Sequence, residues 1–141
     1  MAIAQSKIEQ WKQHTTAGNI DYQQNDIKGA IQSYSQAKRI ALSLFDNSLN
    51  LSDIVPILII SHQNLSFAYK QKKDLINAHK ELVKIHNVLI DLLKSSHQHS
   101  REMLEALHLG IGNTQIELFK FLKEYPMMFD SYLRYNKETL H

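Results

Sequence analysis

The stretch Asp26-Ile27-Lys28-Gly29-Ala30-Ile31 returns 48 residues later as Asp74-Leu75-Ile76-Asn77-Ala78-His79. Each copy has the form of an aspartate cap that opens an amphipathic helix. Four positions after each alanine stands a large apolar or aromatic residue, Tyr34 in the first copy and Leu82 in the second. A helical pair that recurs in this way cannot bury its apolar face alone. We therefore expect the two copies to belong to stacked helical pairs, an arrangement that usually provides a binding surface.

The composition predicts a single all-α domain that spans residues 1–141. The chain has 141 residues, enough for one domain with its own core. Its hydrophobic content of 43% and charged content of 21% are ordinary for a soluble globular protein. Four glycines and two prolines are few, which favours long uninterrupted helices over a sheet that needs many turns.

Composition and charge also exclude several classes of function. The chain has no cysteine, so disulfides, thiol catalysis and thiolate metal sites are excluded. Its 16 basic and 14 acidic residues are interleaved and give a net charge of +2. Because this pattern lacks a broad basic face, we expect no nucleic-acid partner. The longest apolar run, Ile54–Ile60, is too short for a membrane span, and the first residues lack a secretion signal. The expected location is the cytoplasm.

Helical periodicity predicts six helical segments, arranged as pairs at about 3–45, 52–94 and 101–140. The fourth segment has the cleanest spacing, with one apolar stripe of Leu75, Ala78, Leu82, Ile85, Leu89 and Leu92. A second stripe of Ile76, Val83 and Ile90 predicts neighbours on two sides of this helix. It is therefore expected to be the most central element.

Turn and cap residues set the expected ends of the other helices. Ser52 or Asp53 is expected to cap the third helix, with Pro56 in its first turn, where a missing amide costs least. Pro126 is expected to end the fifth helix, because the residue before a proline disfavours the helical conformation. A sixth amphipathic segment would then run from Met127 to about Leu140.

The second unit resembles the tetratricopeptide repeat family. Leu65-Ser66-Phe67-Ala68-Tyr69, followed by Ala78 and Leu82, is similar to the family's Leu-Gly-x-x-Tyr and later Ala-x-x-x-Phe pattern. The period of 48 departs from the family's 34 residues, which places the extra length in longer helices and loops. The resemblance implies antiparallel helical pairs stacked as a short right-handed superhelix of five to six helices. The chain also resembles small bacterial proteins grouped only as a family of unknown function.

The same resemblance implies a concave groove lined by the first helix of each pair. Carried over by register, the expected peptide-binding residues are Lys12, Thr15, Asn19, Tyr22, Gln23, Gln63, Phe67, Lys70 and Gln71. Asn19 matches an asparagine that often holds peptide backbone in that family. The lysine-rich clamp for a C-terminal carboxylate is incomplete, because Thr15 and Phe67 stand at two of its places. The expected function is an adaptor or scaffold that binds a protein or peptide, without catalysis and without a cofactor.

The chain has eight histidines, and they support an alternative function. His79, His86, His97 and His99 could hold a metal together with a carboxylate such as Glu81 or Asp91, as in an enzyme or a metal sensor. The glycines of Gly110-Ile111-Gly112 lack a preceding strand, so they predict a close helix contact rather than a phosphate loop.

The C-terminal segment is unusually apolar. Its large side chains are Tyr125, Met127, Met128, Phe129, Tyr132, Leu133 and Tyr135. They are expected either to cover the last helical pair or to form a homodimer face, since exposed aromatic and methionine patches mark interfaces.

Overall fold

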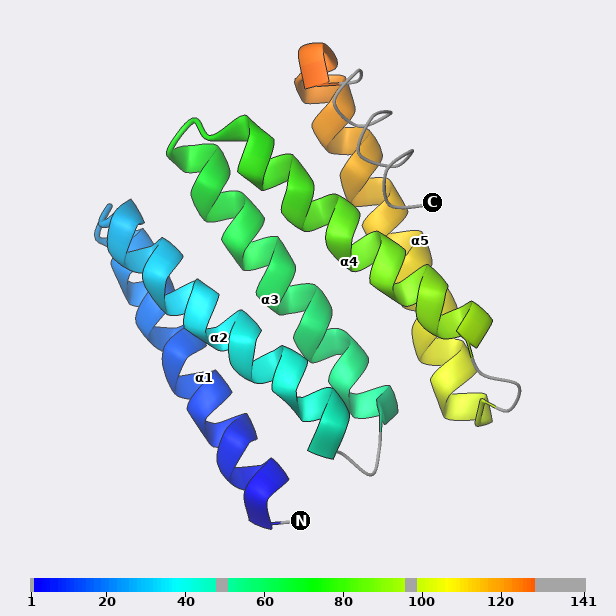
Figure 1. Cartoon of the computed structure of the whole chain (residues 1–141). Helices are drawn as coiled ribbons and strands as arrows, with labels where there is room; N and C mark the ends of the chain where they lie inside the picture. The colour runs from blue at the N-terminus through cyan, green and yellow to red at the C-terminus, as the bar shows by residue number, and fades with distance from the viewer. Residues whose placement is uncertain (1, 48–50, 96–98, 129–141) are drawn as a thin grey trace.

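The protein consists of α-helices packed in chain order. A computed structural model describes residues 2–47, 51–95 and 99–128. Its helices are α1 (Ala2–Gln23), α2 (Ile27–Asn47), α3 (Leu51–Gln71), α4 (Leu75–Ser95) and α5 (Arg101–Glu124), followed by a short 3₁₀ helix, η1 (Pro126–Met128) (Figure 1). The all-α prediction is confirmed for the described part of the chain.

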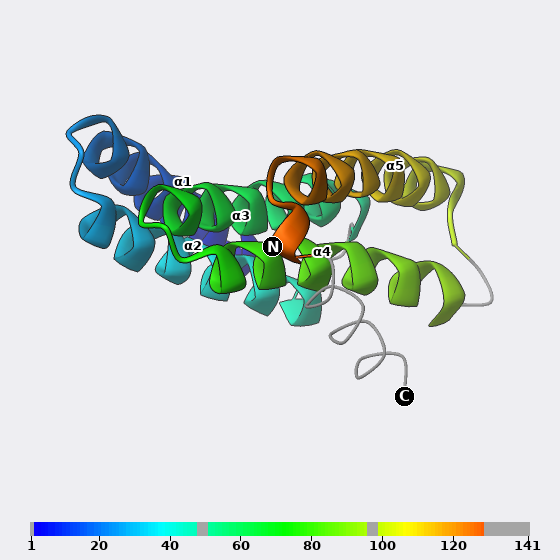
Figure 2. The ribbon, with the colours of Figure 1, turned by 90° about the horizontal axis from the view of Figure 1, so that it is seen from above.

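The helices form two layers. Figure 2 shows α1, α3 and α5 side by side in one layer, with α2 and α4 side by side in the other. Each helix packs on the next one in the chain, and α3 also contacts α5. The fourth helix, α4, packs on α3 and α5 and so has neighbours on two sides, as predicted, but Ile76 of its second stripe is 58% exposed. The most central helix is α3, rather than α4 as expected, because α3 packs on α2, α4 and α5.

The two turns that separate the helices of each pair have the same geometry, 48 residues apart. Asn25 and Lys73 both adopt the left-handed conformation, with φ of 63° and 69°. The residue after each is the predicted cap: Asp26 and Asp74 accept a hydrogen bond from the backbone amide three residues on, at 3.0 and 3.2 Å. An aspartate at this position satisfies one of the free amides of the first helical turn. The sequence repeat is thus a repeat of backbone structure.

Small residues stand where helices touch. Ala30 and Ala78 are both fully buried, as expected. Ala30 belongs to a cluster with Leu65 and Ala68 of α3, and Ala78 belongs to a cluster with Leu118 and Phe121 of α5. In α1, Gly18 faces the ring of Tyr34, and a Cβ atom at Gly18 would lie only 2.5 Å from that ring's Cδ1. These positions let neighbouring helices approach closely, which is why larger residues are absent there.

The core is continuous across the layers. Its largest cluster joins Trp11 of α1 to leucines and isoleucines of α2, α3, α4 and α5. A second cluster lies between α4, α5 and η1, with Leu82, Leu118 and Phe121 among its members. Burial of each such side chain contributes roughly 1.5–3 kcal/mol. The stacking of pairs, rather than any single pair, therefore buries the apolar surface.

The start of α3 differs from the prediction. The helix begins at Leu51, so Ser52 and Asp53 lie within it and neither is its cap. Pro56 consequently lies beyond the first turn, where its ring is exposed to solvent. A proline at that position removes only the hydrogen bond to the carbonyl four residues earlier, in the N-terminal part of the helix.

Two further expectations concern the C-terminal part. The fifth helix ends at Glu124, as Pro126 predicted, and residues 126–128 form the 3₁₀ helix η1. The rest of the predicted sixth segment lies outside the described residues. No helix in the described ranges is both long and apolar enough to span a membrane.

Candidate functional site

Three hollows lie beside α3, on both of its flanks. The α1–α3 hollow has a volume of about 320 Å³ and is lined by Tyr22, Tyr34, Asn64 and Phe67. The charged hollow, between α3 and α5, has about 190 Å³ and is lined by Gln63, Ser66, Phe67, Lys70, Leu82, Glu117, Lys120, Phe121 and Glu124. The apolar hollow, further along the same two helices, has about 350 Å³ and is lined by Val55, Pro56, Ile59, Ile60, Gln63, Ala106, Leu109, Gly110 and Asn113.

Phe67 is the residue that joins these hollows. Its side chain is 48% exposed and lines both the α1–α3 hollow and the charged hollow. Gln63, one helical turn before it, lines both the charged and the apolar hollow. Because α3 presents both residues toward solvent, a ligand that lies along α3 can contact all three hollows at once. An exposed phenylalanine between hollows is a typical anchor for a partner's apolar side chain.

Gly110 sets the depth of the apolar hollow. A Cβ atom at this position would lie 2.9 Å from Cδ1 of Ile59 and 3.1 Å from Cδ1 of Leu89. The glycine therefore lets α5 approach α3 and α4 closely, as predicted. Gly112 does not share this role, because a Cβ atom there would meet no heavy atom within 4 Å.

An ion pair closes the far end of the charged hollow. The Nζ atom of Lys70 donates a hydrogen bond to Oε2 of Glu124 at 2.8 Å and lies 5.6 Å from the centre of the Tyr125 ring. The hydrogen bond to Glu124 raises the pKa of Lys70, and the same bond lowers the pKa of the Glu124 carboxyl. Both groups are therefore charged at neutral pH. A partner that approaches this end meets one cation and one anion that already compensate each other.

The side chains of Tyr34 and Asn19 are joined by a hydrogen bond. The Tyr34 hydroxyl donates it to Oδ1 of Asn19 at 2.6 Å. Burial raises the pKa of the Tyr34 hydroxyl, so the tyrosine is neutral and acts as the donor. The carbonyl of the Asn19 amide therefore accepts a hydrogen bond within the protein.

The structure brings only some of the predicted site residues together. Tyr22, Gln63, Phe67 and Lys70 line the hollows beside α3. The remaining predicted residues, Lys12, Thr15, Asn19, Gln23 and Gln71, do not line these three hollows. Lys12 is exposed and lies 3.5 Å from a carboxylate oxygen of Glu9. The site is thus centred on α3 and its flanks rather than spread evenly over α1 and α3.

The residues that sequence reasoning missed come mainly from α5. Glu117, Lys120 and Glu124 line the charged hollow, and Asn64 lines the α1–α3 hollow. The three α5 residues are spaced at three and four positions, which places them on one side of a helix. That spacing is visible in the sequence, but the side of α5 that faces α3 is decided by tertiary packing.

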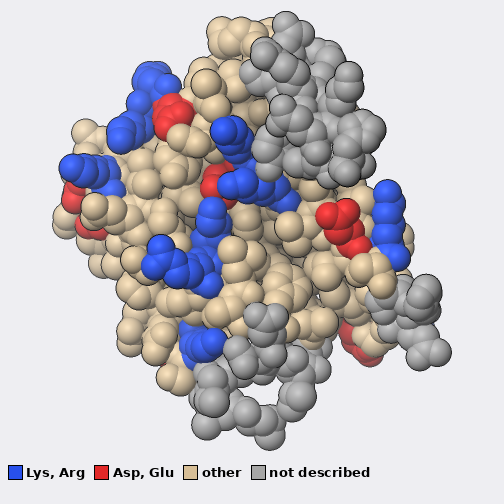
Figure 3. Space-filling model, viewed as in Figure 1, with Lys and Arg blue, Asp and Glu red and all other residues tan. Residues whose placement is uncertain are grey.

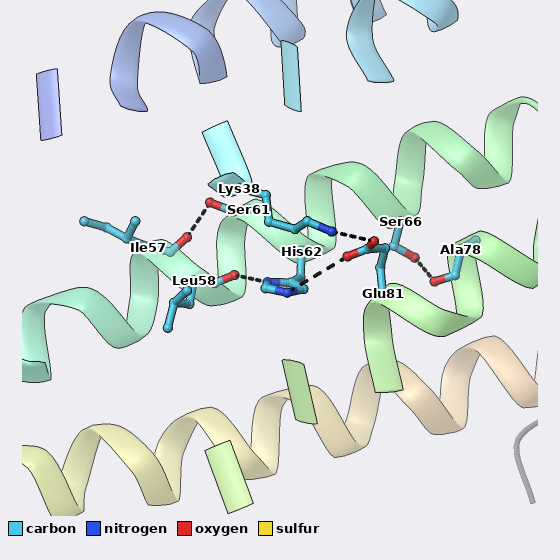
Figure 4. A network of polar contacts seen from close by, with 8 residues as sticks. All are labelled: Lys38, Ile57, Leu58, Ser61, His62, Ser66, Ala78 and Glu81. Atoms are coloured by element: carbon cyan, nitrogen blue, oxygen red, sulfur yellow. Dashed lines mark hydrogen bonds and ion pairs between the residues drawn. The ribbon is translucent and has the colours of Figure 1, made fainter. Parts of the chain in front are cut away.

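A buried polar network ties α2, α3 and α4 together (Figure 4). Lys38 of α2 donates to Oε1 of Glu81 of α4 at 2.8 Å, and the other Glu81 oxygen lies 4.0 Å from Nε2 of His62 in α3. His62 Nδ1 donates to the carbonyl of Leu58 at 2.9 Å. Burial lowers the pKa of His62, which favours its neutral form. The network fixes the relative position of three helices and lies beneath the α2–α4 surface.

The histidines of the metal alternative have separate surroundings. His79 is buried and its ring stacks on Phe121, with 5.5 Å between ring centres. His86 Nδ1 lies 2.7 Å from the Thr114 hydroxyl, and His99 Nε2 donates to the carbonyl of Leu92 at 2.9 Å. Within the described ranges, no group of three or more His, Cys, Asp and Glu side chains could hold a metal ion. His97 lies outside them.

The described part of the C-terminal segment packs on the last helix. Met128 is buried among residues of α4 and α5, and the ring of Tyr125 lies 5.0 Å from that of Phe121. Met127 is 71% exposed. The other residues of the expected dimer face, Phe129, Tyr132, Leu133 and Tyr135, lie outside the described residues.

Fold and site together define, for the described part of the chain, an all-α protein of consecutively packed helices with hollows beside α3. The chain belongs to the family described as protein of unknown function (DUF2753), whose model matches residues 9–137. No curated protein and no solved structure matches the chain.

Proposed function

We propose that this protein is a non-enzymatic adaptor that binds a protein or peptide along α3, with Phe67 as the main contact. The observation that carries the proposal is the position of Phe67, which is 48% exposed and lines two hollows at once. Aromatic residues, phenylalanine included, are enriched in protein interfaces, and exposed apolar patches mark interaction sites.

The proposed arrangement is a tetratricopeptide-like superhelix of stacked pairs, with α1, α3 and α5 lining the binding face. Support comes from the two turns with equal geometry at a spacing of 48 residues and from the two-layer packing. A bound segment would lie along α3, place apolar side chains beside Phe67, and meet amide groups at Gln63 and Asn64. Steric fit and hydrogen bonding would hold it. We propose that the protein does this in the cytoplasm, which its lack of cysteine suits.

Affinity capture with matched variants tests the proposal. The wild-type chain, Phe67→Ala and Phe119→Ala would each be used to capture proteins from a lysate of the source organism. Phe119 is the control because it is 61% exposed and does not line the three hollows. We expect a partner retained by the wild type and by Phe119→Ala to be lost from Phe67→Ala. Equal retention by all three proteins would contradict the assignment of Phe67.

A direct measurement then separates binding from folding. A fluorescently labelled peptide from the captured partner would be titrated with each variant, and circular dichroism would confirm that the variants are folded. Truncation of a central interface residue costs about 2 kcal/mol or more, which weakens binding roughly 30-fold. A loss below about twofold would mean that the partner binds elsewhere.

A further inference from the structure

A second surface lies on the other layer, along the seam between α2 and α4. The seam contains a hollow of about 320 Å³ lined by Leu42, Phe45, Val88, Asp91, Leu92 and Ser95. Leu42 is 43% exposed, so the hollow presents apolar surface to solvent. It is separate from the hollows beside α3, because none of its lining residues is shared with them.

Cations gather on the same face. Figure 3 shows Lys and Arg side chains over the middle of the face formed by α2 and α4. Arg39 of α2 and Lys80 and Lys84 of α4 are exposed. Among the described residues, no carboxylate forms an ion pair with any of these three side chains, whereas Lys38 is already paired with Glu81. The face therefore carries uncompensated positive charge.

The cations directly adjoin the hollow. Lys84 precedes Val88 by one helical turn on α4, and Arg39 precedes Leu42 by three positions on α2. Asp91, further along α4, supplies one acid to the lining of the hollow itself. The exposed Lys94 lies three positions further along α4, so Asp91 is a single acid between cations rather than part of a negative end.

We infer that this seam is a docking surface for an acidic amphipathic helix of a partner protein. Two neighbouring helices leave a groove that accepts a third helix through apolar side chains at three- and four-residue spacing. From Lys80 to Ser95 the seam extends over about 22 Å, which matches a helix of about four turns. The occupant's glutamates or aspartates would face Arg39 and Lys84, its apolar side chains would enter the hollow, and a basic or amide group would face Asp91.

A partner helix fits these features better than a membrane does. Membrane-binding surfaces present protruding apolar side chains that enter the lipid, whereas Leu42, Val88 and Leu92 line a recess. Asp91, at the edge of that recess, would also oppose a uniformly anionic lipid surface. A helix can instead place one complementary group opposite each charge, which gives the complex both specificity and orientation.

A designed peptide tests this inference on the full chain. The probe is an 18-residue labelled helix with leucines at three- and four-residue spacing, glutamates on its remaining surface toward one end, and a lysine at the other. Its charge-reversed twin carries lysines in place of the glutamates. Fluorescence anisotropy would measure both at low ionic strength, and amide NMR shifts would locate the bound peptide. We expect the acidic peptide to bind, its affinity to fall with added salt, and Leu42 and Val88 amides to shift.

Matched variants of the protein complete the experiment. We expect Lys84→Glu and Leu42→Glu each to weaken binding of the acidic peptide roughly tenfold or more. Lys28→Glu, at the start of α2, and Phe67→Ala, on the other layer, should change it less than about twofold. Circular dichroism would confirm folding, and Arg39→Glu would replace Lys84→Glu if the latter failed to fold. Phe67→Ala removes the main contact of the site proposed above, so unchanged binding of the acidic peptide by this variant would show that the seam binds without that site.

Several outcomes would overturn the inference. They are the failure of the acidic peptide to bind, equal binding of its charge-reversed twin, or unchanged binding by Leu42→Glu. Vesicles that contain phosphatidylserine would be tested in parallel. The seam would be a membrane-binding surface instead if these vesicles bound the wild type, bound Lys84→Glu more weakly, and the acidic peptide did not bind at all.

Discussion

Trp11 and Ser61, which are 50 residues apart, form a buried hydrogen bond that joins α1 to α3. The indole Nε1 donates to Oγ of Ser61 at 2.7 Å, and Ser61 in turn donates to the carbonyl of Ile57 at 2.7 Å. Both residues are at most 9% exposed. Helices of two successive pairs are therefore linked by polar contact within the main apolar cluster.

We expect Ser61→Ala to destabilise the protein by about 1–3 kcal/mol, because it leaves a buried indole N–H without a partner. Urea denaturation followed by circular dichroism would measure the free energy of unfolding, and Ser6→Ala, at an exposed position of α1, is the control. The double variant Trp11→Phe/Ser61→Ala should lose less than the sum of the two single changes, since the donor is then also gone. Strict additivity would show that the bond contributes nothing.

The helix crossings give a second prediction. Ala78 is fully buried where α4 meets its neighbours, so Ala78→Leu should destabilise by about 1–3 kcal/mol through overpacking. Ala30→Leu, at the equivalent place in the first pair, should behave alike. Ala17→Leu is the control because Ala17 is exposed in the middle of α1. Midpoints of chemical denaturation would show the difference, and a neutral Ala78→Leu would mean that the repeat does not set the packing.

The repeat shows how much of the fold the sequence predicts. Local rules were sufficient to predict that Asp26 and Asp74 cap their helices, because a cap residue binds backbone amides of its own helix. They were also sufficient for the burial of Ala30 and Ala78, which follows from helical spacing alone. At the start of α3 the same rules failed: Leu51 already lies in the helix, although Ser52 or Asp53 was expected to cap it. Asn50, Ser52 and Asp53 are all good cap residues, and local preference does not choose among them.

The candidate site was less predictable because it depends on which helix faces touch. Phe67 and Lys70 were expected from their register with a family that the chain resembles, and both line hollows beside α3. Glu124 could not, because its pairing with Lys70 spans 54 residues and requires the angle between α3 and α5. The same holds for Lys38 and Glu81, whose ion pair joins α2 to α4. Contacts between distant residues follow from the assembled layers and not from local periodicity.

Two glycines should respond in opposite directions to the same change. Alanine in a helix interior is favoured over glycine by about 0.8–1 kcal/mol. At Gly112 the new methyl group would meet nothing within 4 Å, so we expect Gly112→Ala to stabilise the protein by roughly that amount. At Gly18 it would lie 2.5 Å from two atoms of the Tyr34 ring, which must move and strain the Asn19 hydrogen bond. Thermal unfolding should therefore show a higher Tm for Gly112→Ala and a lower one for Gly18→Ala.

The buried histidines predict that acid destabilises the fold. Burial lowers the pKa of His62, His79 and His86 from the ordinary value of 6.5, so all three are neutral in the folded protein near pH 7. As the pH falls below about 6.5, the unfolded chain takes up protons that the folded protein does not, and folding becomes less favourable. The stabilisation that each neutral histidine gives to the fold is fully present above that pH. It is lost as the pH falls toward the lowered pKa of that histidine in the folded protein.

The free energy of unfolding should therefore decrease between pH 7.5 and 5.5, by up to about 1.4 kcal/mol per pH unit for each histidine. His79→Gln removes one titrating group whose pKa is lowered by burial alone. The free energy of unfolding of His79→Gln should change less steeply with pH over this range than that of the wild type, whatever its value at pH 7.5. Denaturation curves at several pH values would give both slopes. His14→Gln, at a half-buried position in α1, is the control, and equal slopes for His79→Gln and the wild type would show that folding does not change the pKa of His79.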